Sequence, residues 1–163
     1  MGYREFSELF TISGGTLLRR MATGSRGLYG VPVGGLVKGY LRFEYKEVTY
    51  AVHNIVWMIY NQRDIPDGFV VDHEDGNPLN NNPDNLRLAT RTQNCYNSRL
   101  YSNNTSGYKG VSFDKDSGKW LAQIRIDGKN KKLGRYLTAE LANEAVVASR
   151  VKNHKEFANH GND

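Results

Sequence analysis

Short runs of apolar and β-branched residues, separated by glycines, make up the first third of the chain. Glycines interrupt the pattern in TISGGTLL and again in GVPVGGLVKGYLRF, and residues 48–52 are typical of a strand. We therefore expect β-hairpins over residues 1–52. The apolar block HNIVWMIYN that follows, at residues 53–61, contains no helix breaker and predicts a short buried helix.

Two further strands are expected in the middle of the chain, at residues 69–71 and 86–88. The segment between them is made largely of polar residues, glycine and proline, which predicts a long loop that begins at Asp72. Thr90 is a suitable N-cap for a helix that contains Asn94. Two strands, a polar loop and a helix form a ββα unit, which can bring Asp72, His73 and Asn94 together.

The last third of the chain predicts a second, separate set of elements. The polar, glycine-terminated stretch before it is expected to contain a linker at residues 98–106. Three β-prone runs follow at residues 108–113, 120–126 and 132–137. Asp127-Gly128 between two such runs is a strong hairpin signal.

A helix is expected at residues 138–157, with Thr138 as its N-cap. His154 and His160 are expected at the solvated surface. The apolar residues that recur at helical spacing should cover one face of the sheet; they are Leu141, Ala145, Ala148 and Val151.

These elements predict an α+β fold with two domains. The first domain covers residues 1–97, in which a β-rich part (1–52) leads into the ββα core (53–97). A linker (98–106) follows, and then a three-stranded antiparallel sheet packed on one helix (107–158).

The charge distribution also distinguishes the two parts of the chain. The 163 residues include 22 basic and 17 acidic ones, which gives a net charge of +5. Residues 1–104 hold 11 basic and 10 acidic groups, whereas residues 105–163 hold 11 and 7. A localised basic excess is typical of a nucleic-acid surface, so we expect the C-terminal part to bind a polyanion.

Composition excludes several classes of protein. Cys95 is the single cysteine, which rules out an intramolecular disulfide and a multi-cysteine zinc site. The first residues lack a basic segment followed by an apolar run, and no stretch approaches 18 apolar residues. We therefore expect a cytoplasmic protein with no membrane partner.

The central polar loop contains the residue types that phosphodiester hydrolysis requires. A carboxylate such as Asp72 and an amide oxygen such as Asn94 are hard ligands that suit one Mg²⁺ or Mn²⁺ ion. The neighbouring His73 can deprotonate a water molecule. An Asp-His pair in an Asn-rich loop is more often an ordinary turn with a surface imidazole, so these residue types alone leave both interpretations open.

The spacing of these residues resembles that of the HNH homing endonucleases of phages and mobile introns. The similar segments are His53-Asn54-Ile55-Val56, Val71-Asp72-His73-Glu74-Asp75-Gly76-Asn77, Asn80-Asn81-Asn82-Pro83-Asp84-Asn85-Leu86 and Thr90-Arg91-Thr92-Gln93-Asn94. The resemblance implies that Asp72 and Asn94 bind the metal, that His73 is the general base and that Asn85 braces the loop. His53 occupies a further histidine position of the family, where a structural role is expected. It also implies a phage-encoded protein in a bacterial host cell.

Residues 106–158 resemble the DNA-binding domain of plant ethylene-response factors of the Apetala type, which also occurs fused to phage HNH nucleases. The similar segments are YKGV at 108–111, GKWLAQIR at 118–125, LGRY at 133–136 and TAELA at 138–142. The resemblance implies a set of residues that face DNA: Lys109, Ser112, Trp120, Gln123, Arg125, Lys132 and Arg135. Ser112 and Lys132 replace an arginine and a tryptophan of the plant domains, so the plant target sequence does not carry over.

The alternation of side chains along a strand predicts which members of this set share one face of the sheet. Gln123 and Arg125 lie two positions apart on one strand and so point to the same face. Trp120 has the opposite parity to Gln123, so one of these two should face the helix. Lys131, a basic residue of the same sheet, is expected to contact phosphate.

We therefore expect a metal-dependent HNH endonuclease that nicks double-stranded DNA as a monomer and leaves 5′-phosphate and 3′-hydroxyl ends. Two other classes of function are considered: a non-catalytic DNA-binding regulator with a decayed nuclease domain, and a binder of structured RNA. The joint presence of Asp72, His73, Asn85 and Asn94 argues against the regulator. A preference for A-form helices would distinguish the RNA binder.

Overall fold

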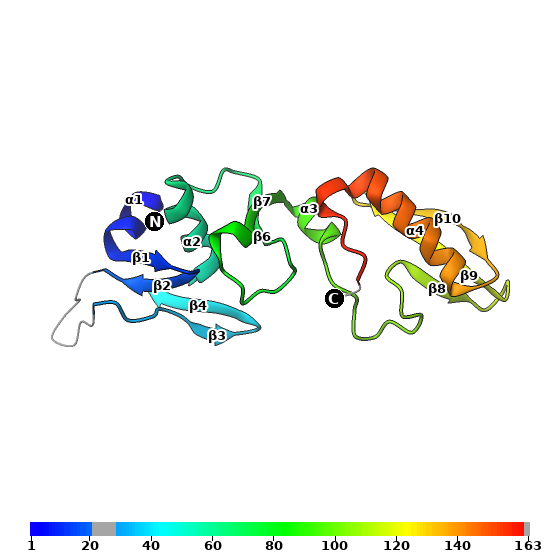
Figure 1. Ribbon diagram of the computed structural model, residues 1–163, viewed down its shortest axis with the longest axis horizontal. Helices are drawn as coiled ribbons and strands as arrows, with labels where there is room; N and C mark the ends of the chain where they lie inside the picture. The colour runs from blue at the N-terminus through cyan, green and yellow to red at the C-terminus, as the bar shows by residue number, and fades with distance from the viewer. Residues whose placement is uncertain (21–28, 162–163) are drawn as a thin grey trace. The chain divides into compact units, whose positions relative to one another are not determined.

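The chain folds into a mixed α+β structure with several small antiparallel sheets and, in the described residues, four α-helices (Figure 1). The computed structural model describes residues 1–20 and 29–161. They form two compact units, Met1–Thr90 and Arg91–Asp163. The short helix at residues 91–96 therefore belongs to the second unit, whereas the sequence pattern grouped it with residues 1–97. No helix in these ranges has the length and apolar character needed to cross a membrane.

The first unit contains three separate antiparallel sheets and two helices. In chain order its elements are α1 (Tyr3–Leu9), β1 (Phe10–Ser13), β2 (Thr16–Arg19), β3 (Gly35–Val37), β4 (Tyr40–Tyr45), β5 (Val48–Ala51), α2 (Val52–Asn61), β6 (Phe69–His73), η1 (Pro83–Asn85) and β7 (Leu86–Thr90). β1 pairs with β2, β3 with β4, β4 with β5, and β6 with β7. The predicted hairpins, the buried helix and the two central strands are thus confirmed.

Helix α1 departs from the hairpin pattern expected for the first 52 residues. Its segment, YREFSEL, contains no glycine, and Phe6 is fully buried in the core of the first unit. The carboxylate of Asp64 accepts a hydrogen bond from the Tyr3 amide at 2.5 Å, across 61 positions of sequence. Because the first amides of a helix have no partner inside it, this helix start depends on a residue that a local pattern does not include.

Helix α2 lies at the centre of the core of the first unit. Val52, Ile55 and Val56 follow one another at helical spacing and are all buried. Gln62 ends the helix in the left-handed conformation, with φ 55°. Apolar side chains of α1, β1, β2, β6 and β7 pack in the same cluster; they include Phe6, Phe10, Leu17, Val71 and Leu86. This cluster anchors both strands of the β6–β7 hairpin.

The β6–β7 hairpin includes two residues that the sequence pattern assigned to the loop. Asp72 and His73 are the last residues of β6, where they pair with Arg87 and Leu86 of β7. Both are buried, at 5 % and 6 % exposure. The loop prediction failed at these positions because it relied on polar residue types alone. It did not include the pairing of β6 with β7, in which both residues are buried. Their backbone is therefore fixed by a sheet.

The second unit consists of a three-stranded sheet and two helices. Its elements are α3 (Arg91–Tyr96), β8 (Val111–Asp114), β9 (Lys119–Ile126), β10 (Lys129–Tyr136), α4 (Ala139–His154) and η2 (Lys155–Phe157). The antiparallel strands follow the order β10-β9-β8, and α4 runs along the sheet (Figure 1). The three predicted strands and the final helix are confirmed. Thr138 Oγ1 accepts a hydrogen bond from the Leu141 amide at 3.3 Å, as an N-cap does.

The buried face of α4 is not the predicted one. Leu141, Ala148 and Val151 are exposed, and of the four expected residues only Ala145 packs against the core. The buried residues of the helix are Ala139, Ala142, Val146, Arg150 and His154. The prediction failed because Arg150 and His154 enter the interior through hydrogen bonds to backbone carbonyl groups, which an apolar pattern does not register. His154 is accordingly not the surface residue we expected.

The segment expected to be a linker, residues 98–106, is folded within the second unit. Ser106 Oγ donates to the Tyr108 and Val111 carbonyl oxygens at 2.9 and 2.8 Å. Asn104 Nδ2 donates to the same Tyr108 carbonyl at 3.1 Å. These bonds tie the segment to the first strand of the sheet.

Candidate active site

Asp72 lies in β6 beside an arginine of the paired strand. Its Oδ2 accepts a hydrogen bond at 3.0 Å from Nε of Arg87, the residue directly opposite in the register. Arg87 Nη1 also lies 3.8 Å from Glu74 Oε1. A buried carboxylate requires a charged partner or hydrogen bonds, and Arg87 supplies both to Asp72.

His73 is held by an asparagine of the β6–β7 loop. Its Nε2 lies 2.9 Å from Asn81 Oδ1, and both residues are buried. An amide oxygen only accepts hydrogen bonds, so the neutral ring donates from Nε2 and carries its lone pair on Nδ1. A fixed tautomer and a fixed ring plane are what a general base requires.

A second histidine, His53 at the start of α2, lies against His73. The two ring centroids are 4.9 Å apart with the planes at 68°. The Tyr40 ring lies 5.6 Å from His53 and 6.3 Å from His73. Burial, together with His73 and Arg42, lowers the pKa of His53 from 6.5 to about 4. His53 is therefore neutral near pH 7 and adds no positive charge beside His73.

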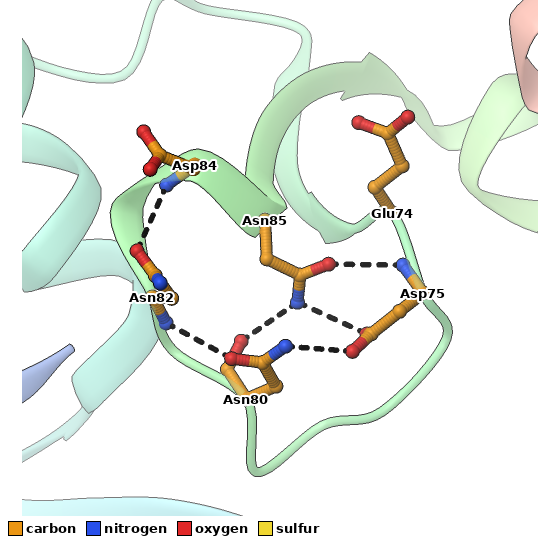
Figure 2. Close-up of a pocket in the computed structure, with 6 residues that line it drawn as sticks. All are labelled: Glu74, Asp75, Asn80, Asn82, Asp84 and Asn85. Atoms are coloured by element: carbon orange, nitrogen blue, oxygen red, sulfur yellow. Dashed lines mark hydrogen bonds between the residues drawn. The ribbon is translucent and has the colours of Figure 1, made fainter. Parts of the chain in front are cut away.

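Asn85 joins the two ends of the β6–β7 loop (Figure 2). Its Nδ2 donates to the Asn80 carbonyl at 2.8 Å and to Asp75 Oδ1 at 3.0 Å, and its Oδ1 accepts from the Asp75 amide at 3.0 Å. Asn80 Nδ2 donates to Asp75 Oδ2 at 2.7 Å. Burial acts to raise the pKa of Asp75, but these hydrogen bonds outweigh it and hold the pKa below its usual value. These side chains close the loop together with one backbone hydrogen bond, from the Glu74 amide to the Asn85 carbonyl oxygen at 2.9 Å.

The β1–β2 turn supports the same loop at Asn81. Gly15 in this turn is buried, has φ 82°, and lies so close that an added Cβ would be 2.6 Å from the Asn81 carbonyl carbon. Only glycine fits a left-handed position with backbone at this distance. The turn therefore limits where the Asn81 backbone can lie, and Asn81 in turn holds His73.

An open pocket on the loop is separate from the Asp72–His73 pair. It has a volume of about 310 Å³, and its lining residues are Glu74, Asp75, Asn80, Asn82, Asp84 and Asn85 (Figure 2). Asp75, Asn80 and Asn85 already use their side chains in the hydrogen bonds that close the loop. We therefore attribute the pocket to the construction of the loop.

Comparison with known proteins places this site in a family. Residues 50–96 match the family model described as HNH endonuclease. The chain is 42 % identical over 91 residues to Protein 3.8 of Escherichia phage T7, covering 55 % of this chain and 74 % of that protein. The chain belongs to the HNH endonuclease family. It is also 39 % identical over 61 residues to the uncharacterized HNH endonuclease L560 of Acanthamoeba polyphaga mimivirus, covering 37 % of this chain and 32 % of that protein. No solved structure matches the chain.

The HNH match contains each residue for which a catalytic or metal-binding role was expected. Asp72, His73 and Asn85 lie in the first unit, and Asn94 is an exposed residue of α3 in the second. Within residues 1–20 and 29–161, no cluster of three or more His, Cys, Asp or Glu could hold a metal ion. A carboxylate and an amide oxygen nevertheless suit Mg²⁺, which commonly completes its shell with water and phosphate oxygens. The chemistry of each of these two donors therefore suits a divalent ion.

Outside the HNH match, the sheet of the second unit has one face directed away from its core. Ala122 and Ile124 of β9 are buried, so the alternating Gln123 and Arg125 lie on the opposite face. Lys132 of β10 is the register partner of Gln123 and belongs to that face as well. We call this surface, with Lys119, Ser112 and Arg135, the open face.

Trp120 and Lys131 are not on the open face. Trp120 packs against the core of the second unit, so of the two alternatives it is Gln123 that points outward. Lys131 is exposed but lies opposite the buried Ile124 in the register. Trp120 is therefore removed from the expected set of DNA-facing residues. Lys131 lies on the side of the sheet opposite the open face.

Lys109 and Arg135 are already engaged within the protein. Lys109 Nζ donates to three backbone carbonyls, those of Tyr96, Ser98 and Asn159. Burial and Arg150 lower the pKa of Lys109 to about 8. Arg135 Nε donates to Asp114 Oδ2 at 2.6 Å across the open face. Lys109 is thus corrected from a DNA-facing residue to an internal one, and Arg135 faces outward with an acidic partner.

Three residues that support the site were missed by sequence reasoning. Arg87 could have been found, because an antiparallel hairpin with the expected strands places it opposite Asp72. Asn81 is one of five asparagines in residues 77–85, and nothing in the composition distinguishes it. Gly15 is distant in sequence, so only the tertiary structure shows its approach to Asn81.

Proposed function

We propose that the protein is a metal-dependent DNA endonuclease that hydrolyses phosphodiester bonds. The observation that carries the proposal is the bond from His73 to Asn81, next to the buried Asp72, inside the segment that matches the HNH endonuclease family. A histidine of fixed tautomer beside a hard oxygen ligand is the combination that metal-assisted hydrolysis uses. DNA is the substrate that membership of this family implies.

His73 is the general base in the proposed reaction. Because its Nε2 donates to Asn81, its Nδ1 takes the proton of the attacking water. The water oxygen bonds to phosphorus as the bond to the 3′ oxygen breaks, and the leaving 3′ oxygen takes a proton from solvent water. The products are a 5′-phosphate and a 3′-hydroxyl. The bond to Asn81 keeps the ring from rotating during the proton transfer. The uncharged His53 ring packs against the same His73 ring.

Asp72 and Asn94 are the proposed ligands of one Mg²⁺ or Mn²⁺ ion. A bound ion would supply stabilisation of the negative charge that develops on the phosphate and the leaving oxygen. Arg87 holds the Asp72 carboxylate through Oδ2 and so fixes its orientation in β6. With only two ligands from the protein, we expect weak metal affinity in the absence of DNA.

The open face of the β8–β9–β10 sheet is the proposed DNA-binding surface. Arg125 and Lys132 carry positive charge there, and Gln123 and Arg125 have the side chains that bond to adenine and guanine edges in a major groove. A sheet of this kind can enter that groove. Because each chain has one proposed catalytic site, which cuts one strand at a time, the proposed product is a nick made by a monomer.

Supercoiled plasmid provides the test of the proposed function. With Mg²⁺ or Mn²⁺ the full chain should convert it first to the open circle, and a chelator should stop the reaction. Linear DNA as the first product, together with a dimer in size-exclusion chromatography, would contradict nicking by a monomer. A protein that binds the plasmid with either metal and never cuts it would instead be a DNA-binding regulator.

A further inference from the structure

Helix α3 is joined to the second unit by a side chain that the proposed reaction does not use. Tyr96, the last residue of α3, is buried and stacks on the His154 ring of α4, with centroids 3.6 Å apart and planes within 5°. The Tyr96 hydroxyl accepts a hydrogen bond from the Asp127 amide at 2.9 Å, in the turn between β9 and β10. One residue of α3 therefore contacts both the helix and the sheet of the second unit.

The backbone that follows α3 is held by the same unit. Lys109 Nζ donates to the carbonyl oxygens of Tyr96, Ser98 and Asn159. Asn159 Nδ2 donates to the Asn97 carbonyl at 3.2 Å, and both asparagines are buried. Buried backbone carbonyls require hydrogen-bond partners, and here the partners are Lys109, just before β8, and Asn159, after η2. Residues 96–98 are thus fixed at their backbone.

His154 connects this arrangement to the proposed DNA-binding strand. Its Nε2 lies 2.8 Å from the carbonyl oxygen of Arg125 in β9. One turn earlier in α4, Arg150 donates to the Lys109 carbonyl. The ring that stacks on Tyr96 is therefore bonded to the backbone of a residue whose side chain belongs to the open face.

We propose that Tyr96 and His154 are positioning residues for Asn94, so that the DNA-binding unit holds the helix that supplies this metal ligand. Asn94 lies two positions before Tyr96 in α3, which has six residues. A helix this short is not stable without tertiary contacts, and the contacts described here are with residues 109–159. The inference rests on the proposed function, in which Asn94 is a ligand. It means that metal binding by Asn94 requires a folded C-terminal unit.

The test uses full-length variants and two readouts other than cleavage. His154→Ala removes the stacked ring, and Tyr96→Phe keeps the ring and removes the bond to Asp127. Val151→Ala is the matched control, because Val151 lies on the same helix and is 60 % exposed. Hydrogen–deuterium exchange reports the mobility of residues 91–98. Electron paramagnetic resonance of added Mn²⁺ reports metal affinity.

We expect His154→Ala to speed amide exchange in residues 91–98 and to raise the Kd for Mn²⁺ by about tenfold or more, the usual effect of removing a residue that orients a ligand. Tyr96→Phe should change both readouts in the same direction by less. Val151→Ala should change neither, and exchange in β6 and β7 should be unchanged in all three variants.

Several results would overturn this inference. Faster exchange in residues 91–98 with an unchanged Kd for Mn²⁺ means that the position of Asn94 does not depend on these contacts for metal binding. If His154→Ala does not fold, an unchanged exchange rate and Kd in Tyr96→Phe has the same meaning. Asn94→Ala separates the two proposals. If it weakens Mn²⁺ binding and His154→Ala does not, only this inference fails; if it leaves Mn²⁺ binding unchanged, the proposed metal site fails with it.

Discussion

The β6–β7 hairpin and the β8–β9–β10 sheet present their candidate residues in opposite environments. In the hairpin, Asp72 and His73 are buried and each is bonded to a partner side chain. On the sheet, Arg125 is exposed and Gln123 is half-buried on the open face. Groups held in place before the reaction need no reordering when charge develops, whereas exposed side chains adapt to the contours of a duplex. The difference supports the proposal that the chemical step belongs to the hairpin and DNA affinity to the sheet.

His73→Ala should give the largest effect and separates the two roles most sharply. Loss of a general base lowers the rate of the chemical step by about 10²–10⁴-fold, while DNA affinity should stay within about twofold of the wild type because positioning is retained. Plasmid nicking measures the first quantity and fluorescence anisotropy with labelled duplex measures the second. Cleavage at the wild-type rate would remove His73 from the mechanism.

Burial of His53, which packs against His73 of the hairpin, should also make the stability of the first unit sensitive to acid. Its folded pKa of about 4 is below the unfolded value of 6.5, so the unfolded chain binds the proton first as the pH falls. Stability present above pH 6.5 is then lost between pH 6.5 and 4, by up to about 3 kcal/mol. Chemical denaturation across this range should show a shallower loss in His53→Gln. Equal slopes in the two proteins would mean that His53 titrates normally.

Asn81→Ala tests whether catalysis by His73 depends on its hydrogen bond to Asn81 of the β6–β7 loop. The change removes the acceptor for His73 Nε2 and should lower the nicking rate by about 10–100-fold, the usual effect of removing a residue that orients a catalytic group. Asn82→Ala is the control, since Asn82 is exposed in the same loop and its side-chain oxygen accepts from the Asp84 amide rather than from His73. Rates should be compared at a temperature where both variants are folded. Equal losses in the two variants would indicate a general effect of the loop instead.

The parts of the fold that were predicted correctly are those whose signals are local. Asp127-Gly128 between two β-prone runs predicts the β9–β10 hairpin, and Thr138 ahead of an uninterrupted segment predicts the start of α4. Helix α1 was missed because the acceptor at its first turn, Asp64, is distant in sequence. The prediction of the buried face of α4 was wrong because two of the buried residues in its C-terminal half, Arg150 and His154, are polar.

The same distinction applies to the candidate site. The motif spacing identifies Asp72 and His73 but says nothing of their burial, which comes from strand pairing with β7. Resemblance assigns a role to Lys109 through its position in a motif, yet its ammonium group is enclosed by three backbone carbonyls. A sequence motif therefore supplies the identity of a residue, and only tertiary contacts decide which partners its side chain has.

Arg125→Ala tests the sheet side of the comparison. If Arg125 bonds to a base on both nitrogens, its loss should cost about 1–3 kcal/mol at the preferred site and relax the choice of base there. Lys131→Ala is the charge-matched control on the opposite register face. Because Lys131 lies away from the proposed DNA-binding surface, its loss should leave both the choice of base and the affinity for the preferred site nearly unchanged. Competition binding against random duplex distinguishes the two patterns, and an Arg125→Ala protein with unchanged sequence preference would exclude base recognition by this residue.

The smallest expected effect concerns Asp114, the acidic partner of Arg135 on the open face. Arg135 Nε bonds to Asp114 Oδ2 at 2.6 Å, and the bond lowers the pKa of Asp114. Asp114→Asn keeps the shape of the side chain, removes a negative charge that would face phosphate and releases Arg135 for DNA. Affinity should therefore rise, and the plot of log K against log salt should steepen by about one unit. Asp116→Asn, in the neighbouring turn, is the control with the same change of net charge. An equal rise in both variants would assign the effect to net charge alone, and no rise in Asp114→Asn would mean that DNA does not lie on the open face.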